Sequence, residues 1–247
     1  MKRLVRFSLL CAAFLSLSCA AFALGDWEYG TPKWITGSGR VETETRAVPG
    51  FTGIEVEGSG NVTLSQGVRQ QLSVEADDNI LPAVTTKVEG GILHLGFAPG
   101  TRITGMTRLE FRITAPEIRG ITISGSGNVR TATVLRGDSL ALRIGGSGSI
   151  DGEIDVRSLE SDIGGSGSIR VRGRAGSQTV AINGSGSVEA RELSSLTSDV
   201  QVNGSGNVTV TATETISIGL SGSGDVFYGG TAAVTIRSSG SGTIRKY

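Results

Sequence analysis

The chain has 247 residues, 38 of them glycine, and its 23 basic residues balance its 23 acidic ones, so the formal net charge is zero. Only 5% of the residues are aromatic. A nucleic-acid partner is not expected, because binding to phosphates requires a concentrated basic surface and binding to single strands requires aromatic stacking platforms.

The first 23 residues have the three parts of a secretory signal peptide. Basic residues stand at positions 2, 3 and 6, an apolar stretch covers residues 7–17, and Ala21-Phe22-Ala23 matches a small-x-small cleavage site. The apolar stretch is shorter than the ~20 residues that a membrane-spanning helix needs. The sequence therefore predicts cleavage after Ala23 and an exported protein, either periplasmic or secreted to the cell surface.

A lipoprotein signal is the alternative at this end of the chain. Leu17-Ser18-Cys19 resembles the end of a lipobox, which would make Cys19 the lipidated residue, but Ser16 stands where that motif has a large aliphatic side chain. Both cysteines, Cys11 and Cys19, lie within the signal. Cleavage after Ala23 would leave a mature chain without disulfides or cysteine metal ligands.

Residues 24–47 alternate poorly between polar and apolar, and they are expected to form an extended arm. The arm contains both tryptophans, Trp27 and Trp34, and a first Gly-Ser-Gly tripeptide at positions 37–39. The aromatic side chains could cover an open end of the fold or form an exposed patch. A cap is favoured, because an open end presents unpaired strand edges.

Residues 48–118 are expected to form irregular coils of a β-helix. Gly58-Ser59-Gly60 lies between alternating apolar residues, but the next such tripeptide comes 67 residues later. Residues 80–84 could form a short helical turn. Residues 85–88 and 92–97 flank Glu89-Gly90-Gly91, a pattern that is typical of a β-hairpin.

Residues 119–247 contain a regular internal repeat in which Gly-Ser-Gly returns every 18 to 21 residues. It begins at Gly125, Gly146, Gly165, Gly184, Gly204, Gly222 and Gly240. Two residues after each tripeptide stands a β-branched apolar residue: Val129, Ile150, Ile169, Val188, Val208, Val226 and Ile244. Period-2 alternation before and after each tripeptide indicates half-buried strands. The repeat therefore predicts an all-β parallel β-helix (β-solenoid) with Gly-Ser-Gly corners.

Glycine suits these corners because it accepts positive φ, which tight turns often require. The corner serines would align along one edge of the solenoid. Beside them a second polar column would form, and it is the candidate binding ladder: Asn128, Ser149, Ser168, Ser187, Asn207, Asp225 and Thr243. Small polar groups also hydrogen-bond to backbone in turns, so a purely structural role is the alternative.

The sequence resembles the auto-transporter adhesin, head GIN domain family of bacterial envelope proteins. The resemblance rests on residues 51–62, 74–81 and 88–93 together with the serial Gly-Ser-Gly turns, and it covers about residues 48–247. It implies a secreted or periplasmic β-helical fold and a role in adhesion. No membrane-anchoring barrel is visible in the sequence, so export through a barrel of its own is not expected.

An enzyme is the less favoured interpretation, and no catalytic residue, metal or cofactor is predicted. Asp151, Glu153 and Asp155 share one side of a strand, but Arg170, Arg172 and Arg174 recur one coil later, which indicates cross-coil charge pairs. The glycine-rich corners lack the aspartate of calcium-binding nonapeptides. His94, the single histidine, is expected to point outward and to stand alone.

The function predicted from the sequence is therefore a non-catalytic envelope protein that binds through an extended repetitive face. Its partner would be a carbohydrate or a protein, and the sequence leaves its identity and the oligomeric state open. A structural or assembly role in the envelope is the first alternative. A β-helical polysaccharide-degrading enzyme is the second, and it would need carboxylates that converge across coils.

Overall fold

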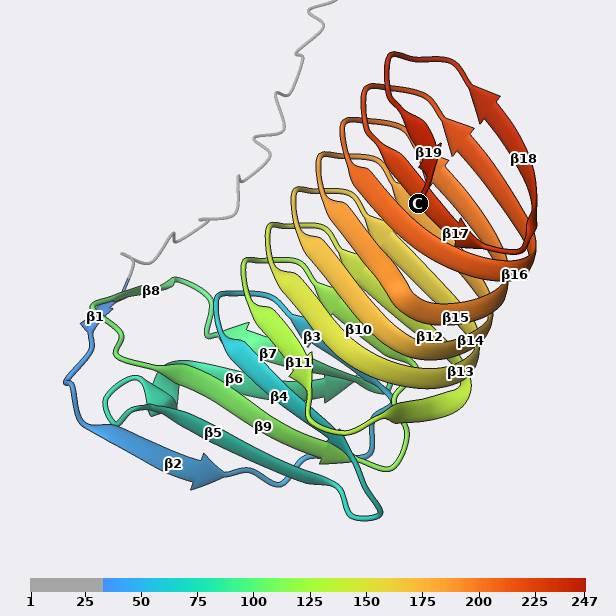
Figure 1. Cartoon of the computed structure of the whole chain (residues 1–247). Coiled ribbons are helices and arrows are strands. Elements are labelled where there is room, and N and C mark those ends of the chain that lie inside the picture. Colours follow the sequence, from blue (N-terminus) through green and yellow to red (C-terminus); the bar gives the residue numbers. More distant parts are fainter. Residues whose placement is uncertain (1–32) are drawn as a thin grey trace, which may run out of the picture. The chain divides into compact units, whose positions relative to one another are not determined.

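The computed structural model describes residues 33–247, whose regular secondary structure is almost entirely β-strand (Figure 1). The only helical element in this part of the chain is a 3-10 turn, η1 (Leu81–Ala83). The strands of the first half are β1 (Lys33–Thr36), β2 (Val41–Thr45), β3 (Gly53–Val56), β4 (Asn61–Gln66), β5 (Gln71–Asp77), β6 (Val84–Glu89), β7 (Ile92–Phe97), β8 (Thr101–Thr104) and β9 (Leu109–Ala115).

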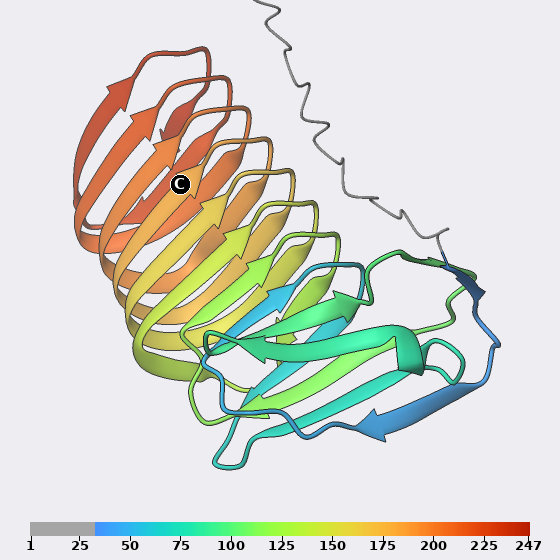
Figure 2. The same ribbon diagram turned by 180° about the vertical axis from the view of Figure 1, so that it is seen from behind.

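The second half of the chain is a regular parallel β-solenoid, as the repeat predicts. Its strands are β10 (Gly120–Ile123), β11 (Asn128–Thr131), β12 (Leu135–Ile144), β13 (Ser149–Ile163), β14 (Ser168–Ile182), β15 (Ser187–Val202), β16 (Asn207–Leu220), β17 (Val226–Gly230), β18 (Ala233–Ser238) and β19 (Ile244–Lys246). Each long strand runs from one Gly-Ser-Gly corner to the next and bends midway (Figure 2). Neighbouring strands pair in parallel with equivalent residues in register, for example Ile150 with Ile169.

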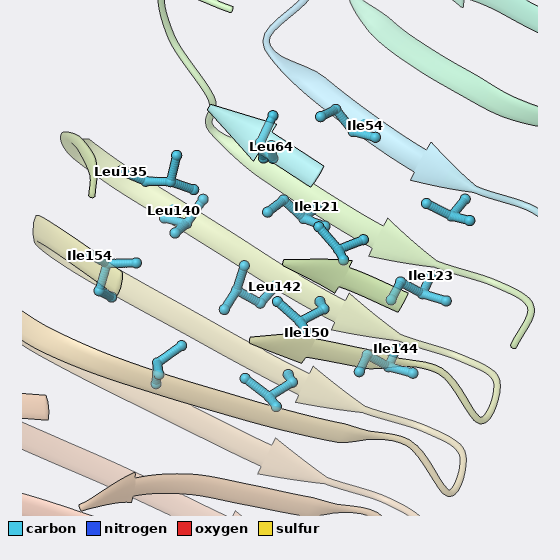
Figure 3. Close-up of a cluster of buried hydrophobic side chains, with 14 of the residues drawn as sticks. Ile54, Leu64, Ile121, Ile123, Leu135, Leu140, Leu142, Ile144, Ile150 and Ile154 are labelled. Atoms are coloured by element: carbon cyan, nitrogen blue, oxygen red, sulfur yellow. The ribbon is translucent and has the colours of Figure 1, made fainter. Parts of the chain in front are cut away.

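The core consists of columns of apolar side chains that run along the solenoid. The residues two places before and two places after each corner from Gly58 to Gly222 are buried, and Figure 3 shows part of these columns. Ile169 is 1% exposed whereas the neighbouring Arg170 is exposed, so the assignment of inside and outside is confirmed. Ser161 interrupts one column between Leu142 and Val180 and is fully buried.

The corner glycines are required by close stacking, and the expectation that they need positive φ is wrong. Among the corner glycines of residues 125–242, only Gly222 has a positive φ. A Cβ on Gly146 would lie 2.0 Å from the carbonyl oxygen of Gly125, and a Cβ on Gly148 would lie 2.1 Å from that of Gly127. Each corner donates a backbone hydrogen bond to the corner of the preceding coil, so no space remains for a side chain.

The first half of the chain adds two coils and an antiparallel layer to the solenoid. Strands β3 and β4 stack beneath β10 and β11, and β7 and β9 stack in parallel beneath β3 and β4. Strands β5 and β6 then pair antiparallel with β9 and β7, and β2 pairs antiparallel with β5. The predicted hairpin at Glu89-Gly90-Gly91 and the short helical turn are confirmed.

Hydrogen bonds to Asp77 connect the arm at Gly39 and the loop at Thr107 to this antiparallel layer. Its fully buried carboxylate accepts hydrogen bonds from the backbone N–H of Gly39 at 2.7 Å and from the N–H and hydroxyl of Thr107 at 2.8 and 2.9 Å. Burial raises the pKa of Asp77, but these hydrogen bonds outweigh burial and hold the pKa below its ordinary value.

The expectation that aromatic side chains of the arm cap the fold is wrong for Trp34. This side chain is 64% exposed and stacks with Arg102, whose guanidinium carbon lies 5.6 Å from the ring centre. The arm instead adds strand β2 to the antiparallel layer by backbone pairing with β5. Trp27, the predicted signal peptide, its cleavage site at Ala23 and the alternative lipidation site at Cys19 lie outside the described residues.

Candidate functional site

The corners place three parallel columns of small polar residues on one narrow surface, which we call the corner face. One column holds the corner serines, all of them exposed: Ser126, Ser147, Ser166, Ser185, Ser205, Ser223 and Ser241. The column before it is also fully exposed and holds Ser124, Gly145, Gly164, Asn183, Asn203, Ser221 and Ser239. The column after it is the predicted ladder from Asn128 to Thr243, whose members are exposed or half-buried.

The structure aligns the predicted ladder residues, and several of them hydrogen-bond along the column. Parallel pairing joins Asn128, Ser149, Ser168, Ser187 and Asn207 in register, and Asn61 extends the column beneath Asn128. The Ser149 hydroxyl donates to Asn128 Oδ1 at 2.7 Å. Towards the other end, the backbone N–H of Asp225 donates to Asn207 Oδ1, and that of Thr243 donates to Asp225 Oδ1, both at 3.0 Å.

The hydroxyls of the corner serines are free, whereas several ladder side chains form hydrogen bonds along their column. Within residues 33–247, none of the seven has a hydrogen-bond partner for its side chain, although their backbone N–H groups hold the coils together. Each hydroxyl can act as donor and acceptor toward a ligand. Successive coils of a β-structure lie about 4.8 Å apart, so the face offers the same group at a regular interval.

The corner face is almost free of charge. Among the 21 residues of its three columns from Ser124 to Thr243, Asp225 is the only ionisable side chain. Charged residues begin in the next column on each side, where Arg130, Asp151 and Arg170 align on one flank. A shallow hollow of about 270 Å³ adjoins the face near Asn203, Ser221 and Ser239. This surface suits neutral hydrogen-bonding groups.

The acidic residues considered for catalysis are paired with arginines across coils, as the sequence indicated. Arg172 lies 3.4 Å from Asp151 and 3.6 Å from Glu153, and Arg174 lies 3.3 Å from Asp155. All five side chains are at least 40% exposed, so these ion pairs contribute little to stability. Each of these three carboxylates therefore faces an arginine of the next coil.

A similar network covers the outer face of β9. Hydrogen bonding by Arg108 outweighs the effect of burial and, together with the charge of Arg112, holds the pKa of Glu110 below its ordinary value. Arg108 and Arg112 also contact Glu75 at 3.3 and 3.2 Å. These charges support the pairing of β5 with β9.

The interpretation of His94 as an isolated side chain is corrected by the structure. His94 is half-buried on the outer face of β7, and its Nδ1 lies 3.0 Å from Glu57 Oε1 and 3.5 Å from Glu55 Oε2. Sequence reasoning missed this cluster because Glu55 and His94 are 39 positions apart and meet only through the register of β3 with β7. The alternation that puts Glu55 and Glu57 on one side of the chain was the available signal.

Together these features define a parallel β-solenoid with a repetitive, neutral polar surface. The chain belongs to the family described as "Putative auto-transporter adhesin, head GIN domain", whose model matches residues 50–232. No curated protein matches the chain significantly. Among the described residues, no helix has the length and apolar character needed to cross a membrane.

Several solved structures share this fold. A putative adhesin from Bacteroides fragilis is 25% identical, with a TM-score of 0.83 over 86% of this chain and all of the other. A protein from Parabacteroides distasonis described as a putative lipid binding protein is 23% identical, with a TM-score of 0.74 over 87% of this chain and 100% of the other. A putative adhesin from Parabacteroides merdae is 18% identical, with a TM-score of 0.71 over 87% of this chain and 99% of the other.

Proposed function

We propose that this protein is a non-catalytic adhesin-like module of the bacterial envelope that binds a carbohydrate or protein partner along its corner face. The observation that carries the proposal is the alignment of seven exposed corner serines, free of partners within the described chain, on a nearly uncharged surface. Repeated neutral donors and acceptors match a ligand that itself repeats, such as a glycan chain. Membership of an adhesin family is consistent with this role.

Binding through such a face should depend on many weak, equivalent contacts. Avidity then makes the affinity fall gradually as coils are altered. Glycan arrays and pull-down with the mature chain would identify the partner. Asn128→Ala, Asn207→Ala and Asp225→Ala should each weaken binding modestly, and the triple variant should weaken it more.

The corner serines give a sharper test, because their replacement leaves the hydrogen bonds of the ladder intact. Ser166→Ala, Ser185→Ala and Ser205→Ala combined should reduce binding while leaving the melting temperature unchanged. Glu160→Gln, at an exposed residue outside the three columns of the corner face, is the control. Unchanged binding in the serine variant would contradict the proposal.

If the protein were an enzyme, a single substitution would have a much larger effect. Removing one catalytic carboxylate typically lowers turnover by orders of magnitude. If Asp151→Asn, Glu153→Gln or Asp155→Asn alone abolished a polysaccharide-degrading activity, the adhesin-like function would have to be abandoned. If the protein instead has a structural or assembly role, its loss should cause envelope defects, and no ligand should bind the corner face.

Export is part of the proposed function. It is supported by the basic, apolar and small-x-small segments of residues 1–23. Intact-mass analysis of the exported protein should show a mature chain that starts at Leu24. Detection of a diacylglyceryl-modified chain that starts at Cys19, and its loss in Cys19→Ser, would show that the protein is a lipoprotein and is not cleaved after Ala23.

A further inference from the structure

Glu55, Glu57 and His94 form a cluster of potential metal ligands near the first corner. One ligand atom from each, the imidazole nitrogen and a carboxylate oxygen from each glutamate, lie within 4.8 Å of one another. The side chains of Glu55 and His94 are 26% exposed and that of Glu57 is 50% exposed. The group is therefore partly sheltered and still open to solvent on one side.

The backbone fixes the relative positions of these three side chains. Glu55 and His94 are direct neighbours in the parallel pairing of β3 with β7, and the N–H of Glu57 donates to the carbonyl oxygen of Leu95 at 2.9 Å. Strands hold their side chains more rigidly than loops do, which favours a preformed site.

Two further residues shape the cluster. The Ser124 hydroxyl, which belongs to the next coil, donates to Glu55 Oε1 at 2.7 Å and leaves Oε2 facing His94. Hydrogen bonds of this kind orient metal-binding carboxylates. On the other side, a Cβ on Gly96 would lie 3.1 Å from Glu57 Oε2, so the absence of a side chain at residue 96 lets Glu57 lie against the sheet.

The charge around the cluster favours a cation. The nearest ammonium group on the neighbouring strand is that of Lys87, which pairs in register with His94, but Lys87 forms an ion pair with Glu89. The two carboxylates can balance the charge of a divalent ion. One nitrogen and two oxygen ligands suit zinc and similar transition metals, whereas calcium and magnesium prefer oxygen alone.

We propose that Glu55, Glu57 and His94 bind a divalent transition-metal ion, with Zn²⁺ as the best-matched ion. Three protein ligands leave one position of a tetrahedral site for water or for a group from a ligand. The site would join β3 to β7, where the last parallel coil meets the antiparallel layer. The site borders the corner face, because Ser124 of that face holds Glu55, but it uses none of the seven corner serines, and its metal binding can be measured without the ligand of that face.

Isothermal titration of the chain with Zn²⁺ tests this assignment directly. The protein must be purified with a histidine-free affinity tag, because His94 is then the only imidazole in the sample. We expect one Zn²⁺ per chain and a loss of affinity of about tenfold or more in His94→Gln, Glu55→Gln and Glu57→Gln. The matched control Glu160→Gln should bind Zn²⁺ like the parent chain.

A second readout separates ligation from a change in folding. In a ¹⁵N-histidine-labelled sample, Zn²⁺ should shift the Nδ1 resonance of His94, and circular dichroism should show that the metal-free variants keep the parent fold. If the cluster does not bind a metal, the contact between His94 and Glu57 is only a hydrogen bond, and Zn²⁺ should not change the resonance. Absence of binding at millimolar Zn²⁺, a stoichiometric site that survives His94→Gln, or a His94 resonance that does not respond would each overturn the proposal.

Discussion

The backbone N–H of Ser126 donates a hydrogen bond of 3.2 Å to the carbonyl oxygen of Gly58, although 68 positions separate the two residues. The corner at Gly58 therefore lies directly beneath the corner at Gly125. The intervening segment leaves the solenoid, builds the coil of β7 and β9 with its antiparallel neighbours, and returns on the opposite side of β3 and β4. What reads as a gap in the repeat is an insertion between two stacked coils.

Ile169→Asp should severely destabilise the solenoid, and Arg170→Asp should not. Ile169 is 1% exposed within an apolar column, so an aspartate there would bury an unpaired charge at a cost of about 4 kcal/mol or more. Arg170 faces the solvent. Thermal melts of both variants provide the measurement, and equal losses would contradict the assigned orientation of the strand.

Gly148→Ala should lower the free energy of unfolding by about 3 kcal/mol, because its Cβ would overlap the carbonyl oxygen of Gly127 and approach Ile123. Gly145→Ala is the control, since a Cβ at that position meets nothing within 4 Å. Chemical denaturation of the two variants distinguishes close stacking from a simple preference for glycine in turns. Similar losses in both would argue for the turn preference.

Ser161→Val should stabilise the protein by about 1 kcal/mol. The hydroxyl of Ser161 is buried without a hydrogen-bond partner among residues 33–247, and its neighbours in the column are Leu142 and Val180. Removing an unsatisfied buried hydroxyl and extending the apolar column are both favourable. The control Ser166→Val, at an exposed corner, should leave the melting temperature unchanged. A lower melting temperature for Ser161→Val would show that the column has no space for the larger side chain.

Asp77→Asn should destabilise the protein at neutral pH and make its melting temperature less dependent on pH under acidic conditions. The folded-state pKa of Asp77 lies below its ordinary value, so the ionised carboxylate stabilises the fold fully above the unfolded pKa of about 3.9. This contribution is lost as the pH falls through the folded pKa. Melting temperatures of both proteins between neutral pH and strong acid should converge at the acid end, and a constant difference would contradict the role of the charge.

The regular coils could be predicted from the sequence because their two periodicities agree. Alternation in steps of two fixed which residues face inward, and the tripeptide fixed where each coil turns, so the column from Val129 to Val226 was recognisable in advance. The polar ladder followed from the same alignment. These features depend only on residues within one coil and on the stacking of equivalent coils.

The remaining features depend on contacts between dissimilar segments. The cluster at His94 and the hydrogen bonds of Asp77 require the register of strands that share no repeat, which no local pattern encodes. The physical reason for glycine at the corners also does not follow from the sequence alone. The limiting contact is with the carbonyl oxygen of the coil below, and a single turn considered by itself does not contain that atom.

Coil length varies in this protein, yet the corners remain aligned. The register shifts of β14 with β15 lie between Arg170 and Gly173, and those of β15 with β16 lie after Ala190, within the long strands and outside the Gly-Ser-Gly corners. Additional residues are thus accommodated where they do not disturb the corner face. The surface can therefore keep the same chemistry and the same spacing along its length even though the coils beneath it differ in length.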